Sequence, residues 1–89
     1  MITRKVKIVN RLGLHARPSA LLVTIASRYQ SSVFLQRDDL KVNGKSIMGV
    51  MMLAAEKGAQ ITFEVDGPDE EKAMEALVEV VMSGFGEEN

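Results

Sequence analysis

The sequence predicts an open-faced α/β sandwich, one sheet of four strands with helices packed on a single face. Two observations point to it. Period-two alternation marks strands, and three- and four-residue steps mark helices, in the order β-α-β-β-α-β-α. The length of 89 residues suits one domain over residues 1–89, because a second core would have too few residues to close.

The first predicted strand runs from Ile2 to Ile8, where alternate positions form a basic outer face. Residues 10–13 break the alternation. A helix is then expected to start at His15 or Ala16, because Pro18 fits only in a first helical turn. Its inner stripe is predicted to comprise Pro18, Leu21, Leu22, Ile25 and Tyr29.

The middle of the chain predicts a hairpin followed by a short helix. Strands over 32–37 and 40–43 flank a turn at Asp38-Asp39. Ser46 is expected to cap a helix over 47–55 that Gly58 closes.

The last two elements are the clearest. Residues 59–65 alternate strictly, which predicts a strand. The acidic segment 69–71 opens the final helix, where carboxylates favour the positive end of the helix dipole. Its inner stripe is predicted to comprise Ala73, Leu77, Val80, Val81 and Phe85, and Gly84 and Gly86 are expected to end it.

Composition excludes several classes of function. The chain has no cysteine and one histidine, so we expect no metal site and no cofactor. A net charge of −1 and 4% aromatic residues argue against nucleic-acid binding. The longest apolar run, residues 47–55, is far shorter than the roughly 20 residues of a membrane span, so no membrane insertion is expected. The start lacks a signal-peptide pattern, and a cytoplasmic location is expected.

The most informative segment is residues 13–18, GLHARP. It places the lone histidine, His15, at a helix start, where free backbone N–H groups bind anions and favour a neutral, nucleophilic ring. Arg17 adds a guanidinium that can bind phosphate oxygens, and Pro18 fixes the turn. Each residue alone has an ordinary explanation as a surface side chain or a helix start. Their combination predicts phosphoryl transfer to His15.

Ser46 and the apolar run after it allow two interpretations. Ser46 is a good helix cap, and a phosphate there would also suit a helix start. The methionines pack either into the core or against partners, because so short a helix cannot bury every face.

The GLHARP segment, the KSIMG segment at 45–49 and Gly67 before an acidic helix resemble the HPr family. These are histidine-containing phosphocarriers of the bacterial phosphoenolpyruvate-dependent sugar phosphotransferase system. The resemblance spans essentially the whole chain. It implies an α+β open-faced two-layer sandwich, with an antiparallel sheet in the order 1-4-2-3 and three helices on one face.

The resemblance also implies roles and partners. His15 would accept a phosphoryl group on Nδ1 from enzyme I and pass it to enzyme IIA domains, with Arg17 positioning the phosphate. Ser46 would match the site of a serine kinase and its phosphorylase, and the Ser46 phosphoform would bind a catabolite-control regulator. The surface that binds partners would comprise Leu14, Ala16, Ala20, Thr24, Ile47, Met48 and Met51.

Two alternatives stay open. A nitrogen-related branch of the phosphotransferase system keeps the histidine motif, although its members usually lack the stretch found here at 46–49. A regulatory interaction module would use Ser46 and the methionine helix without phosphoryl relay.

Overall fold

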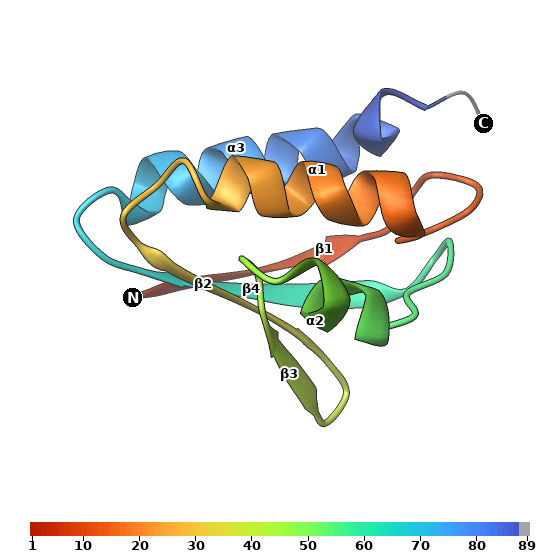
Figure 1. The fold of residues 1–89 in the computed structure, drawn as a ribbon, viewed down its shortest axis with the longest axis horizontal. Coiled ribbons are helices and arrows are strands. Elements are labelled where there is room, and N and C mark those ends of the chain that lie inside the picture. Colours follow the sequence, from red (N-terminus) through yellow and green to blue (C-terminus); the bar gives the residue numbers. More distant parts are fainter. Residues whose placement is uncertain (88–89) are drawn as a thin grey trace.

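Strand β4 (Gln60–Asp66) lies inside a four-stranded antiparallel sheet with β1 (Ile2–Lys7), β2 (Ser32–Arg37) and β3 (Leu40–Asn43), in the order β1-β4-β2-β3 (Figure 1). The computed structural model describes residues 1–87. The elements in chain order are β1 (Ile2–Lys7), α1 (Ala16–Ala26), β2 (Ser32–Arg37), β3 (Leu40–Asn43), α2 (Ile47–Met52), β4 (Gln60–Asp66), α3 (Glu70–Met82) and a 3₁₀ turn, η1 (Gly84–Gly86). The predicted strand order and element order are confirmed.

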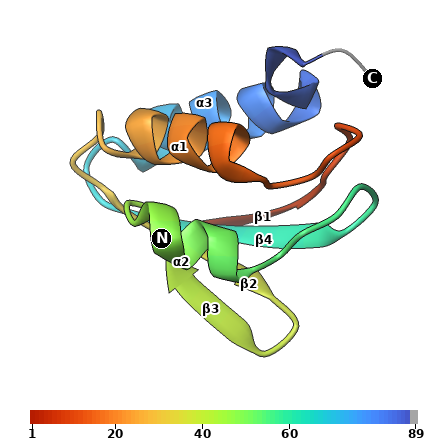
Figure 2. The ribbon, with the colours of Figure 1, turned by 45° about the vertical axis from the view of Figure 1, so that its right-hand side comes forward.

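The helices form the second layer of the sandwich. Helices α1 and α3 run side by side over one face of the sheet, and the short α2 packs beside α1 (Figures 1 and 2). The turn η1 lies close to the first turn of α1, since residues of both line one pocket and Glu87 contacts His15. The expected open-faced α+β sandwich is therefore confirmed.

The core lies between these layers and follows the period of each strand. In β4, Ile61, Phe63 and Val65 are buried, and the residues between them face away from the core. A shift of one residue would turn this entire apolar set to solvent, so burial fixes the register Val6 opposite Ile61. Leu22, Leu77 and Val81 supply the facing helical side chains.

Four sequence predictions need correction. Helix α2 ends at Met52 and not at residue 55, because Ala54 takes a left-handed conformation with φ +47°. Gly58 belongs to the turn before β4 and does not close the helix. Leu21 is 36% exposed, since it lies at the rim of a pocket and not on the inner stripe. Phe85 is buried as expected, but it reaches the core from η1.

Candidate functional site

His15 is the residue that caps the N-terminus of α1. Its backbone is extended, with φ −77° and ψ −170°, and its carbonyl oxygen accepts the first helical hydrogen bond from the Ser19 N–H at 3.0 Å. The imidazole makes no capping bond to the helix. The ring lies at the helix start. The N–H groups of Ala16 and Arg17 belong to the first turn and have no acceptor within the helix.

The two ring nitrogens of His15 have different surroundings. Nε2 lies 2.8 Å from Oε2 of Glu87, whereas Nδ1 has no hydrogen-bond partner within residues 1–87. The side chain is 34% exposed, and that of Glu87 is 25% exposed. One nitrogen is thus held by a carboxylate, and the other keeps its bonding capacity.

Asn10 holds the opposite side of the Glu87 carboxylate. Its fully buried side chain donates from Nδ2 to Glu87 Oε1 at 2.9 Å and to the Gly13 carbonyl oxygen at 2.8 Å. Both neighbours are acceptors, so the amide nitrogen must face them. The loop before α1 and the end of the described chain are joined through this amide.

The loop before His15 is also held by the backbone of Ala55. Gly13 has φ +68°, and a Cβ atom there would lie 2.3 Å from the Ala55 carbonyl oxygen. That same oxygen accepts a hydrogen bond from the Leu14 N–H at 2.8 Å. Only glycine fits this approach, and the contact fixes His15 relative to the segment after α2.

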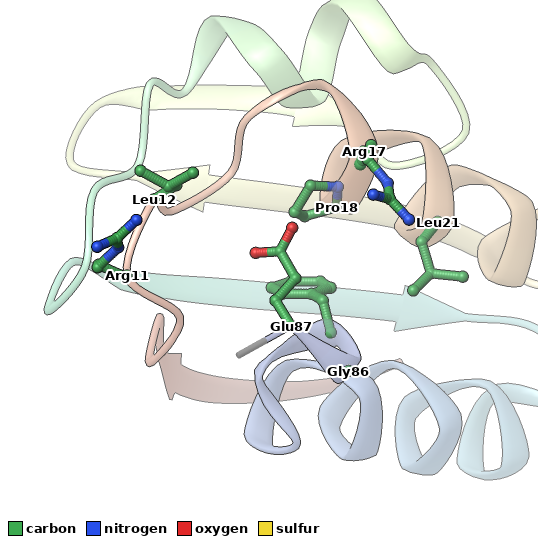
Figure 3. Close-up of a pocket in the computed structure, with 8 residues that line it drawn as sticks. Arg11, Leu12, Arg17, Pro18, Leu21, Gly86 and Glu87 are labelled. Carbon is green, nitrogen blue, oxygen red and sulfur yellow. The ribbon is translucent and has the colours of Figure 1, made fainter. Parts of the chain in front are cut away.

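A pocket of about 480 Å³ opens between the start of α1 and η1 (Figure 3). Arg11, Arg17 and Glu87 supply its charged groups, and the Glu87 carboxylate points toward the first turn of α1 (Figure 3). Within the described residues the Arg17 side chain has no hydrogen bond or ion pair. Its guanidinium remains available to bind an anion at this helix start.

Ser46 caps α2 as the sequence predicts. Its Oγ accepts a hydrogen bond from the Gly49 N–H at 3.1 Å, and the side chain is partly exposed. The helix it caps leaves most of its apolar side chains in solvent. Met48 is 77% exposed, and Ile47, Met51 and Met52 are also exposed, whereas Val50 is buried. The methionines of α2 therefore form a surface and not part of the core.

The other residues expected to meet partners have mixed exposure. Ala16 and Thr24 are exposed on α1 and Ala20 is partly exposed. Leu14 is 5% exposed and belongs to the core, so it can support this surface only from beneath. Pro18 is buried in the first turn of α1.

Sequence reasoning missed Asn10 and Glu87. The contact of Glu87 with His15 spans 72 positions and depends on the backbone path through η1, so no local pattern announces it. Among residues 1–87 there is no group of three or more acidic, histidine or cysteine side chains suited to a metal ion. Within the same part of the chain, every helix is too short or too polar to cross a membrane.

A lone histidine at the start of a helix, with an arginine two residues later on a small two-layer sandwich, is the arrangement expected of a phosphoryl carrier domain. The comparisons with known proteins agree with this class. The family model described as "PTS HPr component phosphorylation site" matches residues 2–83. Phosphocarrier protein HPr of Cupriavidus necator is 51% identical over 87 residues, which cover 98% of each chain.

The structural comparison gives the same result. A crystal structure of HPr from Thermoanaerobacter tengcongensis superposes with a TM-score of 0.96 at 45% identity, covering all of both chains. The HPr-like protein Crh of Bacillus subtilis is 47% identical over 81 residues, which cover 91% of this chain and 95% of Crh. The chain belongs to the HPr family, the phosphocarriers of the phosphotransferase system.

Proposed function

We propose that His15 carries the phosphoryl group, bound through Nδ1, from enzyme I to the enzyme IIA domains of the sugar phosphotransferase system. The observation that supports this most is the asymmetry of the ring, in which Nε2 is held by Glu87 and Nδ1 has no partner among the described residues. Neutral imidazole is a competent nucleophile at its unprotonated nitrogen.

In this proposal the chain supplies one covalent group, His15, and Arg17 and Pro18 assist it without forming a bond to phosphorus. As the Nδ1–phosphorus bond forms, the bond between phosphorus and the donor breaks and its electron pair leaves with the donor. The negative charge on the phosphoryl oxygens lies next to the helix start and the Arg17 guanidinium, both of which stabilise it. Pro18 holds the first turn in helical geometry. We infer that the protein is a transfer intermediate and not a stand-alone enzyme.

Enzyme I and enzyme IIA domains are the partners of this relay. Helices α1 and α2 contact each other, and the docking surface combines Ala16, Ala20 and Thr24 of α1 with the exposed Ile47, Met48 and Met51 of α2. Methionine side chains adapt to differently shaped partners. A small apolar surface suits contacts that must form and dissociate quickly. The protein acts as one domain over residues 1–89 in the cytoplasm.

Ser46 is proposed as a second, regulatory phosphorylation site. A serine kinase would add the phosphate, a phosphorylase would remove it, and the phosphoform would bind a catabolite-control regulator. The partly exposed Oγ and its place beside the docking surface support this role. A phosphate there would face the same partners as the methionines and repel an acidic one.

Intact-mass spectrometry after incubation with phosphoenolpyruvate and enzyme I tests the relay. One added phosphoryl group, labile in acid, is expected on the parent chain and on the control Arg28→Ala, whose side chain lies outside the site. His15→Ala should fold and gain none. Arg17→Ala should fold and transfer slowly, and an unchanged rate would remove Arg17 from the mechanism.

The similarity to Crh favours one alternative, a regulatory module that works through Ser46. Phosphorylation of Ser46 by the serine kinase, without any transfer to His15 from enzyme I, would support it. Transfer from the enzyme I of the nitrogen branch alone would place the chain in that branch.

A further inference from the structure

Glu87 is held at both carboxylate oxygens. Oε2 lies 2.8 Å from His15 Nε2, and Oε1 accepts a hydrogen bond from Nδ2 of the fully buried Asn10 at 2.9 Å. A surface carboxylate with one contact would move among rotamers. This one has a buried donor that fixes it against the ring.

We propose that Glu87 is a positioning residue for phosphoryl transfer, which keeps the His15 proton on Nε2 and the nucleophilic lone pair on Nδ1. The inference rests on the proposed function of His15 as the phosphoryl acceptor. An ionised carboxylate only accepts hydrogen bonds, so Nε2 must be the donor in this pair. In a neutral ring the lone pair is then on Nδ1, which has no partner within residues 1–87.

The carboxylate also balances the charge that develops during the reaction. When Nδ1 bonds to phosphorus, the donor leaves with its electron pair, and the ring keeps its Nε2 proton and becomes positive. Glu87 carries the opposite charge 2.8 Å from that nitrogen. A buried carboxylate stabilises the imidazolium of hydrolytic triads in the same manner. On delivery, the Nδ1–phosphorus bond breaks, its electrons return to Nδ1, and the Nε2 proton never leaves.

The backbone conformation of residues 84–86 sets the direction of the Glu87 side chain. Gly84, Phe85 and Gly86 all have positive φ, of +71°, +59° and +71°. Phe85 takes this conformation at a cost that burial of its ring offsets, since it is only 8% exposed. The Glu87 N–H then closes the turn on the Gly84 carbonyl oxygen at 3.0 Å. The turn thereby directs the carboxylate toward the start of α1 (Figure 3).

The opposite role, a carboxylate that repels the incoming phosphoryl group, fits the geometry less well. Glu87 contacts Nε2, and the phosphoryl group would bond to Nδ1 on another edge of the ring. The two roles predict opposite kinetic effects of removing the carboxylate.

The test compares Glu87→Ala and Glu87→Gln with the parent and with Glu75→Gln, a control on the exposed side of α3. Nitrogen-15 NMR of the neutral His15 ring measures the tautomer, and single-turnover phosphorylation by enzyme I measures transfer. Glu87→Ala should raise the fraction of rings protonated at Nδ1. Both Glu87 variants should slow transfer at saturating enzyme I about tenfold, the loss of a hydrogen bond to a charged group, with the apparent KM little changed. Glu75→Gln should match the parent in both measurements.

Equal or faster transfer in both Glu87 variants would overturn the proposal, as would an unchanged tautomer in Glu87→Ala. Amide NMR spectra would establish that the variants fold. If the parent chain accepted no phosphoryl group, the proposed function would fail, and the tautomer measurement alone would then decide whether Glu87 sets the proton position.

Discussion

Arg37 donates a hydrogen bond from its guanidinium to the Ala54 carbonyl oxygen at 2.9 Å, just beyond the end of α2. The same nitrogen lies 3.2 Å from the Leu53 carbonyl oxygen, and the second nitrogen contacts Glu56 Oε1 at 2.8 Å. Strand β2 thus supplies the cation for the negative end of a helix that has no basic residue in its last turn.

Replacing this cation should loosen α2. We expect Arg37→Ala to lower the free energy of unfolding by about 1 kcal/mol, because several hydrogen bonds are lost at a partly exposed site. Urea unfolding measures the change, and amide exchange over 50–56 should quicken. The control Arg28→Ala should alter neither, and an equal effect in both variants would contradict this role for Arg37.

Ser19 holds the loop that carries His15. Its buried hydroxyl donates to the Leu14 carbonyl oxygen at 3.1 Å. Ser19→Ala should leave that carbonyl without this donor and cost about 1 kcal/mol of stability. The comparison in thermal unfolding is Ser27→Ala, whose exposed side chain should tolerate the change. A more stable Ser19→Ala variant would show that the hydroxyl merely fills space.

Ionisation of Asp69 makes the free energy of unfolding depend on pH. Hydrogen bonds from the Ser31 hydroxyl and the Gln30 N–H lower the pKa of this carboxyl below its ordinary value of 3.8. A carboxyl whose pKa falls on folding stabilises the protein above its unfolded-state pKa, and this contribution is lost as the pH drops through the folded-state value.

Unfolding free energies at pH 7 and pH 3 measure that contribution. Asp69→Asn should be less stable than the parent at pH 7, and the difference should shrink at pH 3. The control is Asp39→Asn in the exposed β2–β3 turn. A difference of the same size at both pH values would exclude ionisation of Asp69 as its cause.

A substitution of Met48 tests the docking surface without changing the core. Because its side chain is 77% exposed, Met48→Glu should change stability by less than about 0.5 kcal/mol. Transfer from enzyme I should slow through a higher KM, since a charge replaces apolar contact area. Met82→Glu on α3, where the side chain is 59% exposed, is the matched control. Similar KM values for the two variants would move the docking surface away from α2.

Two variants of Ser46 distinguish its role as a helix cap from its proposed role as a regulatory phosphorylation site. Ser46→Ala should cost about 1 kcal/mol, because the Gly49 N–H loses its acceptor. Ser46→Asp retains an acceptor and should stay close to the parent in urea unfolding, yet it should slow transfer from enzyme I. If Ser46→Asp unfolded α2, a phosphate would act through the fold and not through repulsion of a partner.

The sequence was sufficient to predict the strands and the helix start at His15, because both depend on local patterns. The alternation over 59–65 follows directly from burial of one face of the strand. Pro18, three residues after His15, indicates a helix start. The end of α2 escaped prediction, since Arg37 lies in a distant strand and Ala54 adopts a conformation that its residue type disfavours. Glu87 escaped for the same physical reason, because its contact exists only in the folded chain.

The central place of β4 has a consequence for how the protein acquires its fold. Both β1 and β2 pair with β4 and not with each other, so neither can complete its ladder until residues 60–66 are available. Closing such long loops costs entropy before the contacts form. During synthesis, β1 must therefore wait for a strand made late in translation, and a shortened chain that stops before β4 would expose Val6, Val33 and Leu35 to aggregation or to chaperones.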